Sequence, residues 1–429
     1  MRDLSARGPA VPITAELVVR RPFGNGSVAL IREKHTNPAV TVLGYLPAGA
    51  MYDPPGKAGV ALFTSLMLTR GTVSYTSERL ALLLDSLGAT LSARADLEGV
   101  TFSARCLAED VGRILELIAE VLLRPTFPPD EIEKQRARMI TGIRESRLDT
   151  RVAAEKAFRE VAYPAAHPHH RTPEGEEDTV AAMTREDLVA FHRRHYRPEG
   201  LVVAVVGDVA APRIVERLAA LWEGWRPSGA VDAIEIPAAG PAASVQRRVV
   251  TIPGKSQADI VLGVPGFARK SAEFYPAMMA DLILGRLGLM GRLGATVRDK
   301  EGLAYYVYSR AQAGFLAGPW AVRAGVNPRN VDRAVEGIVR EIRGLQREPV
   351  RNGELPDAQN YLIGSLALRL ETDAGVAQAL VEIEVFGLGL DYLLRYPGLI
   401  RGVTPAAIGA AASRYLQLDG YTVAMAIPA

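Results

Sequence analysis

The segment MTREDLVAFHRRHYRPEGLVVAVVG, residues 183–207, has a counterpart about 220 residues later, VTPAAIGAAASRYLQLDGYTVAMAI at 403–427. Each segment has a Thr at a helix N-cap position, a helical stretch that leads to a Tyr, an acidic residue and a Gly at a turn, and a β-branched strand. The same helix and strand in the same order predict that the chain contains two copies of one fold.

Further matches follow at nearly the same offset. ITGIRESRLDT (140–150) matches LIGSLALRLET (362–372), and FSARCLAEDVGRILELI (102–118) matches WAVRAGVNPRNVDRAVEGI (320–338). We therefore expect two homologous domains, 1–224 and 246–429, joined by an Ala-, Pro- and Gly-rich linker at 225–245. Hairpin-like strands mixed with long helices favour an α+β fold with antiparallel or mixed sheets backed by helices. Two similar domains that face each other would form a cleft suited to a ligand.

Composition narrows the class of protein. The 429 residues carry a net charge of +2, so no strong field points to nucleic acid, and the many Arg residues read as solvated helix faces. The single cysteine, Cys106, permits neither an intramolecular disulfide nor a Cys-based zinc site and is expected to be an inert core thiol. No run of about 18 apolar residues predicts a membrane span. The chain reads as cytoplasmic, although an exported, periplasmic form without its leader would read the same.

The six histidines offer the first candidate for a metal site. HPHH at 167–170 is the densest group, but Pro168 breaks any helix there, so a solvated loop is favoured over zinc binding. HRRH at 192–195 places two His on one helix face, yet no acidic residue stands beside them and Arg193 and Arg194 oppose a cation. We expect no metal at either place.

The segment LGRLGLMGRLG, residues 284–294, is rich in glycine. It lacks a preceding strand and the spacing of a phosphate-binding loop, so we expect a small-residue helix face or a loop beside a substrate. Its glycines are three residues apart, at Gly285, Gly288, Gly291 and Gly294.

The second candidate is a pair of residues in RDKEGLAYYVYS (298–309). Arg298 and Tyr305 lie seven apart, across a Gly-containing turn, and can project from a helix end and a strand start towards one point. The alternative is a surface Arg and a packed Tyr. Strand alternation puts Tyr306 and Tyr308 on the face opposite Tyr305.

In order along the chain, FGNGSVALI, GVALFTSLMLTRGT, LGATLSARADLEGVTFSA, RPTFPPDEIEKQR, HPHHRTPEGEEDTVAAMTREDLVAFHRRHYRPEGLVVAVVGDV and GRLGATVRDKEGLAYYVYS resemble the pitrilysin/insulinase family of zinc metallopeptidases. The resemblance is to its short bacterial, mitochondrial-processing-peptidase-like branch and covers nearly the whole chain. It implies two α/β-roll halves that pair like a clam around a peptide chamber.

Active members carry H-x-x-E-H, in which two His bind zinc and the Glu is the general base. By the resemblance this motif falls on Leu62, Ser65 and Leu66, in KAGVALFTSLMLTRGT (57–72). The further Glu ligand falls near Gly142, with Glu145 the nearest acid. The resemblance thus implies a degenerate zinc site and a chain that is inactive alone.

Arg298 and Tyr305 match the pair with which active members hold the substrate backbone. The resemblance therefore implies a non-catalytic, peptide-binding subunit of a heterodimeric zinc metallopeptidase, with zinc held by a partner that contains HxxEH. The glycine-rich segment is similar to the substrate-contacting glycine loop of the mitochondrial non-catalytic subunit. Three alternatives stay open: a scaffold like the core subunits of respiratory complex III, a homodimeric peptide-binding protein, and an enzyme that uses the HPHH cluster.

Overall fold

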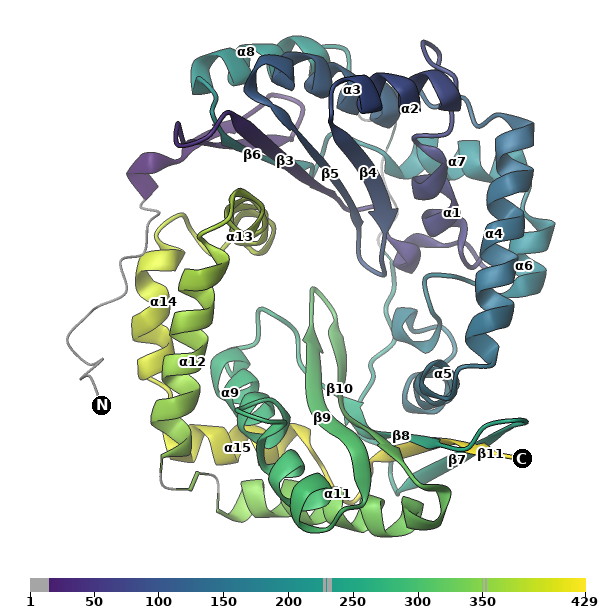
Figure 1. The fold of residues 1–429 in the computed structure, drawn as a ribbon, viewed down its shortest axis with the longest axis vertical. Coiled ribbons are helices and arrows are strands. Elements are labelled where there is room, and N and C mark those ends of the chain that lie inside the picture. The colour runs from purple at the N-terminus through teal and green to yellow at the C-terminus, as the bar shows by residue number, and fades with distance from the viewer. Residues whose placement is uncertain (1–14, 227–228, 230–233, 349, 352) are drawn as a thin grey trace. The chain divides into compact units, whose positions relative to one another are not determined.

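The computed structural model describes residues 15–226, 229, 234–348, 350–351 and 353–429 (Figure 1). The chain divides into two compact units, each built from three segments. The first unit contains the described residues up to Ile143 together with Thr172–Ile234 and Leu366–Arg395, and the second contains Arg144–Arg171, Glu235–Ser365 and Tyr396–Ala429.

The first unit is built on a mixed sheet of six strands. Their order is β1 (Val19–Pro22), β2 (Val28–Glu33), β6 (Val202–Gly207), β3 (Ala39–Leu46), β5 (Val100–Leu107) and β4 (Thr90–Ala95). The helices that lie wholly in this unit are η2 (Ala15–Leu17), η3 (Ala50–Tyr52), α1 (Val60–Met67), α2 (Ser77–Ser86), η4 (Ala108–Asp110), α3 (Val111–Leu123), α6 (Glu177–Ala182), α7 (Arg185–His195), α8 (Ala211–Trp222) and α13 (Asp373–Phe386).

The second unit is built on a sheet of five strands. Their order is β7 (Gln246–Ile252), β11 (Thr422–Pro428), β8 (Ala258–Pro265), β10 (Ala317–Val326) and β9 (Ala304–Ala313). Its helices are α5 (Thr150–Ala162), η5 (Pro168–His170), α9 (Phe274–Gly285), α10 (Gly291–Leu293), the π-helix η6 (Gly294–Lys300), η7 (Pro328–Asn330), α11 (Val331–Arg347) and α15 (Pro405–Tyr415). Three further helices span a boundary between the units, namely α4 (Pro129–Arg147), α12 (Glu354–Arg369) and α14 (Tyr392–Arg401).

The two sheets confirm the internal repeat. The order β2-β6-β3-β5-β4 recurs as β7-β11-β8-β10-β9, and in each sheet the first of these pairs is parallel while the others are antiparallel. The expected N-caps are also confirmed, because Thr184 accepts the Asp187 N–H at 3.3 Å and Thr404 accepts the Ala407 N–H at 3.2 Å. The fold is therefore α+β, with mixed sheets backed by helices.

The compact units do not coincide with the expected domains 1–224 and 246–429, because each half of the sequence gives one helix to the other half's sheet. Helix α5 packs on β7, β8 and β11, and α13 packs on β3 and β6. Glu155 of α5 makes two hydrogen bonds with Arg323 of β10, at 2.9 and 3.0 Å. Asp373 of α13 pairs with Lys34 at 2.7 Å. Sequence matching could not show this exchange, because it depends on contacts between residues far apart in the chain.

The expected linker, 225–245, is only partly described. Residues 234–245 form no regular helix or strand, and 227–228 and 230–233 lie outside the described residues. The Ala242 N–H donates to the Gly420 carbonyl at 2.9 Å, so the end of this segment is held beside β11.

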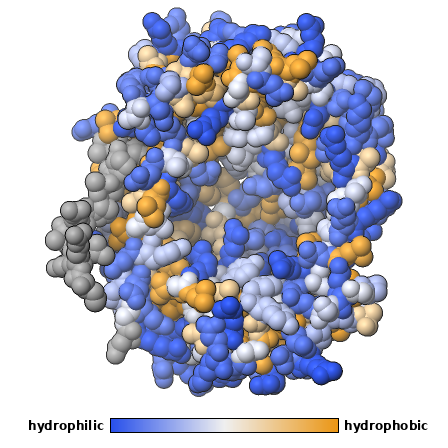
Figure 2. Space-filling view, in the orientation of Figure 1, coloured by the Kyte–Doolittle hydropathy of each residue, from blue (hydrophilic) through white to orange (hydrophobic). Residues whose placement is uncertain are grey.

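Burial follows the sheets. Every residue of β6, VVAVVG, is buried, as expected for a central strand covered on both faces, and Figure 1 shows α3 and α8 on one face of this sheet and α13 on the other. Cys106 is buried in the same core, and burial raises the pKa of its thiol to about 11. On the face shown in Figure 2, hydrophobic residues are interspersed with hydrophilic ones. No helix among the described residues is long and apolar enough to cross a membrane.

Candidate functional site

Arg298 and Tyr305 lie next to each other in the second unit. Arg298 is near the end of the π-helix η6, and Tyr305 is the second residue of β9. The Arg298 Nε donates to the Tyr305 carbonyl oxygen at 3.1 Å, and Nη1 donates to the Asp299 carboxylate at 2.9 Å. The Tyr305 side chain is 64% exposed, which makes a packed Tyr wrong. The two residues therefore do meet at a helix end and a strand start.

Both side chains retain donors for a ligand. Within the described part of the chain, neither the Arg298 Nη2 nor the Tyr305 hydroxyl has a hydrogen-bond partner. A guanidinium and a phenol hydroxyl both donate to carbonyl or carboxylate oxygens. Strand β9 also lies at the edge of its sheet, because it pairs with β10 alone. The arrangement suits an extended ligand that carries carbonyl groups.

The neighbouring tyrosines point the other way, as strand alternation predicts. The Tyr306 and Tyr308 rings lie side by side, with centroids 6.0 Å apart. The Tyr306 hydroxyl donates to the carboxylate of Asp259, a residue that is 1% exposed, and the Thr150 hydroxyl donates to the same group. Burial, and then the bond to Asp259, raise the pKa of Tyr306 well above its usual value. This half-buried cluster around the buried Asp259 holds the start of β9 and so sets the outward direction of Tyr305.

The glycine-rich segment is a turn, and the expected small-residue helix face is wrong. Gly288 and Gly291 have φ of +60° and +61°, in the left-handed region that interrupts a helix. A Cβ on Gly291 would lie 2.5 Å from the Ile283 carbonyl oxygen, so the segment folds tightly back on α9. Met290 also has a positive φ, of 70°. The segment ends α9 and leads into the helix that carries Arg298.

Helix α1 contains the first set of candidate positions, in the first unit. The Asp53 carboxylate accepts the N–H groups of Gly59 and Ala61 at 2.7 and 3.0 Å and so fixes the start of the helix. Leu62 is 3% exposed in the core, and Leu66 is half-buried and packs against that core. Ser65 is 1% exposed.

Ser65 joins α1 to the edge strand β4. Its hydroxyl donates to the Leu62 carbonyl at 2.8 Å and accepts the Ala95 N–H at 2.8 Å. Both capacities of the hydroxyl are thus used within the protein. A buried serine whose proton and one lone pair are used in this way is a structural residue.

Gly142 lies on an exposed part of α4 and supplies no side chain. Across the described ranges of the chain, nothing beyond its two chain neighbours and its helix's own backbone lies within 4 Å of where its Cβ would be. Glu145, the nearest acidic residue, is also exposed, one turn further along α4. Arg136, earlier on α4, lies over the Phe63 ring at 5.6 Å, so α4 and α1 are adjacent in this unit.

Three of the six histidines, His167, His169 and His195, are buried, whereas His35 is exposed. His167 and His169 are buried and stack with ring centroids 5.6 Å apart, so the expected solvated loop is wrong for these two. Burial lowers the pKa of His169 to about 3 and that of His192 to about 4. The His192 Nε2 contacts the Leu122 carbonyl at 2.8 Å. Among the described residues, no three His, Cys, Asp or Glu side chains gather to hold a metal ion.

Comparison with known proteins shows the family to which the chain belongs. Residues 28–168 match the profile described as Insulinase (Peptidase family M16), and residues 182–362 match the Peptidase M16 inactive domain. The chain belongs to the insulinase family of peptidases, family M16.

Relatives and solved structures agree. An uncharacterized zinc protease of Streptomyces coelicolor is 26% identical over 377 residues, which are 86% of this chain and 80% of that protein. The mitochondrial-processing peptidase subunit beta of Blastocladiella emersonii is 25% identical over 387 residues, 86% of this chain and 80% of that protein. The crystal structure of a peptidase M16 inactive domain from Pseudomonas fluorescens has a TM-score of 0.88 and 25% identity, covering 96% of this chain and 98% of that chain.

Several of these insulinase-family relatives are named zinc proteases, but the candidate zinc positions of this chain do not fit the metal. Leu62 and Leu66 end in hydrocarbon, Gly142 has no side chain, and the Ser65 hydroxyl is already engaged twice. Zinc sites in proteins are made by His, Cys, Asp and Glu. No step of a reaction can therefore be assigned to a metal on these residues.

Three residues important for the geometry gave no signal in the sequence. Asp259, Arg292 and Glu354 are buried or half-buried polar groups that hold β9 and the helix before it. Arg292 lies within the glycine-rich segment, but its partner is 62 residues away. The sequence alone carried no mark that joined them.

Proposed function

We propose that this chain is the non-catalytic, peptide-binding subunit of a heterodimeric zinc metallopeptidase. Arg298 and Tyr305 bind the backbone of the substrate, and a homologous partner that contains HxxEH holds the zinc and the general base. The observation that carries this proposal is the pairing of an exposed Tyr305 with an Arg298 whose Nη2 is available, in a chain whose own candidate zinc positions cannot ligate a metal.

The chemistry of the pair supports a peptide ligand. Arg298 is fixed by its bonds to the Tyr305 carbonyl and Asp299, so its remaining N–H groups have a defined direction. In this proposal a peptide carbonyl accepts from Nη2, and the Tyr305 hydroxyl donates to the same or the next carbonyl. These bonds read the backbone of a peptide and not its side chains, so the pair gives binding and orientation with little sequence preference.

The first unit also supports the proposal that this chain binds peptide while a partner subunit carries out hydrolysis. A peptidase of this type needs a metal and a base to activate water. In this chain, the first unit fills the corresponding helix with Leu62, Leu66 and a hydrogen-bonded Ser65. The chain therefore contributes binding residues, and hydrolysis requires a second subunit.

The test is peptide hydrolysis with added zinc, using internally quenched peptides of mixed sequence. The purified chain is assayed alone and together with the HxxEH-containing homologue from the same organism. We expect cleavage only in the mixture. Arg298→Ala and Tyr305→Phe are expected to lower kcat/KM of the mixture at least tenfold. The control is Arg310→Ala, an exposed Arg on the same strand, which is expected to leave it unchanged.

The other outcomes separate the alternatives. Peptide binding without cleavage in any mixture would favour a homodimeric peptide-binding protein. A stable assembly that is indifferent to Arg298→Ala would favour a scaffold. Cleavage by the chain alone, with zinc bound in a one-to-one ratio, would contradict the proposal and point to the buried histidines around His169.

A further inference from the structure

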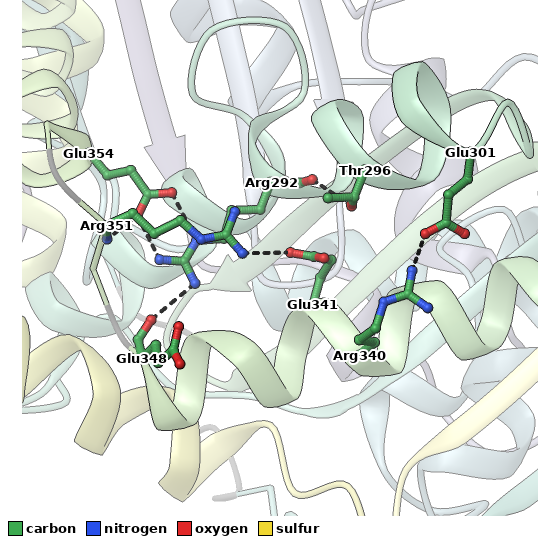
Figure 3. A network of polar contacts seen from close by, with 8 residues as sticks. All are labelled: Arg292, Thr296, Glu301, Arg340, Glu341, Glu348, Arg351 and Glu354. Atoms are coloured by element: carbon green, nitrogen blue, oxygen red, sulfur yellow. Dashed lines mark hydrogen bonds and ion pairs between the residues drawn. The ribbon is translucent and has the colours of Figure 1, made fainter.

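The helix that carries Arg298 is anchored in the interior by a second arginine. Arg292, in α10, has a side chain that is only 1% exposed. Its Nε and Nη2 donate to the two carboxylate oxygens of Glu354 at 2.9 and 2.6 Å, and its Nη1 donates to the Glu348 carbonyl at 3.2 Å. Figure 3 shows Arg292 held in this way between the end of α11 and the start of α12.

Both carboxylate oxygens of Glu354 accept hydrogen bonds at this contact. Burial alone would raise the pKa of its carboxyl, but the hydrogen bonds from Arg292 and from the Arg351 N–H, at 2.6 Å, outweigh burial and lower it. Arg351 in turn lies 3.5 Å from the buried carboxylate of Glu341. The two-pronged bond of an arginine to a carboxylate permits one relative geometry, so Arg292 fixes the rotation of its helix as well as its place.

This anchor is needed because the preceding segment is strained. Met290 adopts a left-handed backbone conformation without being glycine, and Gly288 and Gly291 have the same sign of φ. Such a segment persists when its surroundings determine it. At its other end Arg286 pairs with the buried Asp281 at 3.3 Å. An arginine that is paired with a carboxylate therefore lies on each side of the turn, Arg286 before it and Arg292 after it.

The anchor and Arg298 share one continuous helical stretch, 291–300. The Thr296 hydroxyl donates to the Arg292 carbonyl at 2.8 Å. The Val297 side chain lies against Gly337 of α11, where a Cβ on that glycine would be 3.2 Å from the Val297 Cγ2 atom. Residues 294–300 form a π-helix, a rare conformation that occurs frequently at functional sites. The rotation of this helix determines whether the Arg298 Nε faces the Tyr305 carbonyl.

We propose that the ion pair between the buried Arg292 and the half-buried Glu354 positions Arg298 and Tyr305 for peptide binding. This inference rests on the proposed function, because it assigns a purpose to the same Arg298–Tyr305 site. Arg292 and Glu354 are positioning residues and touch no substrate. Apolar side chains would fill the same volume, but they would not fix the rotation of the helix.

The experiment uses the full chain with Arg292→Met, Arg292→Lys and Glu354→Gln. The control is Arg343→Gln, an exposed Arg on α11. Amide hydrogen exchange of peptides that cover 294–305 is measured on each chain. We expect exchange there to be at least tenfold faster in Arg292→Met and Glu354→Gln, with β6 unchanged and Arg292→Lys intermediate. An unchanged β6 shows that the chain is folded.

The second measurement separates positioning from a merely structural role. Each variant is titrated into the zinc-binding homologue with the quenched peptides. We expect kcat/KM to fall at least tenfold in Arg292→Met while the concentration for half-maximal assembly stays the same, and Arg292→Lys to recover part of the loss. Unchanged exchange at 294–305, or faster exchange with unchanged kcat/KM, would overturn the positioning role.

The two proposals fail in different ways. If the wild-type mixture cleaves nothing, the proposed function is contradicted. Binding of fluorescein-labelled β-casein to the free chain, measured by anisotropy with Arg298→Ala as reference, then replaces cleavage as the readout. Binding that depends on Arg298 and is lost in Arg292→Met still supports the positioning role, and its absence in the wild type overturns both proposals.

Discussion

Replacing Ser65 with Ala is expected to destabilise the first unit by about 1–3 kcal/mol, although the change removes one atom. The Ser65 hydroxyl accepts the Ala95 N–H at 2.8 Å, and both residues are 1% exposed. Without the hydroxyl, that N–H is left buried and unpaired, and the expected loss is the cost of leaving a buried donor unsatisfied. The lost bond to Leu62 adds little, because it is local to the helix.

The chain offers a matched control. Ser86 in α2 makes the same kind of bond, from its hydroxyl to the Leu83 carbonyl at 2.8 Å, but it is exposed and has no second partner among the residues that the structure describes. Ser86→Ala is therefore expected to change the free energy of unfolding by less than about 0.5 kcal/mol. Native-state hydrogen exchange of α1 and β4 as a function of urea is the suitable assay, because two units need not unfold in one transition.

Equal effects of the two substitutions would refute this reasoning. They would mean that water reaches the Ala95 N–H, and that Ser65 does not tie α1 to the sheet. The helix would then be free to carry other groups at position 65, and Ser65→Glu would be tolerated. With the bond intact, Ser65→Glu is expected to cost more than Ser65→Ala, because it also buries an unpaired carboxylate.

Three further outcomes are expected. Burial lowers the pKa of His192 to about 4, so between about pH 6.5 and pH 4 the unfolded chain binds a proton that the folded chain does not bind. The free energy of unfolding is therefore expected to fall by about 3 kcal/mol as the pH falls from about 6.5 to 4. Urea midpoints of His192→Phe measured across this range should show a smaller loss. Glu155→Gln weakens its paired bonds with Arg323 and should lower the stability of the second unit by about 2 kcal/mol. The loss is measured on the whole chain, as the urea dependence of hydrogen exchange in β10. Asp259→Asn replaces the carboxylate that receives the Tyr306 hydroxyl and should cost about 1–3 kcal/mol in hydrogen exchange of β8 and β9.

The sequence predicted those features that short-range signals encode. The N-cap threonines, Thr184 and Thr404, precede helices that end at a turn and a strand. The approach of Arg298 to Tyr305 was also predictable, because only a short turn separates the helix from the strand. Such features depend on residues within a few positions of one another, and local propensity decides them.

Contacts between distant residues could not be predicted in this way. Nothing near Arg292 indicates that Glu354 binds it, and nothing in HPHH indicates that His167 and His169 are buried beneath other aromatic rings. The glycine spacing suggested a helix face because periodicity says nothing of the sign of φ at Gly288. Each of these outcomes depends on tertiary packing, which overrides the local pattern.

The exchange of helices makes the core of each unit depend on both halves of the sequence. Strand β6 is buried on both faces, with α3 and α8 on one side and α13, from the second half of the sequence, on the other. Helix α5 covers the second sheet in the same way. Neither half of the sequence therefore contains the complete core of its own unit, and a fragment of residues 1–224 would leave one face of β6 in water. The first half of the sequence is therefore indispensable to the second unit, because it supplies the helix α5 that covers the sheet on which Tyr305 lies.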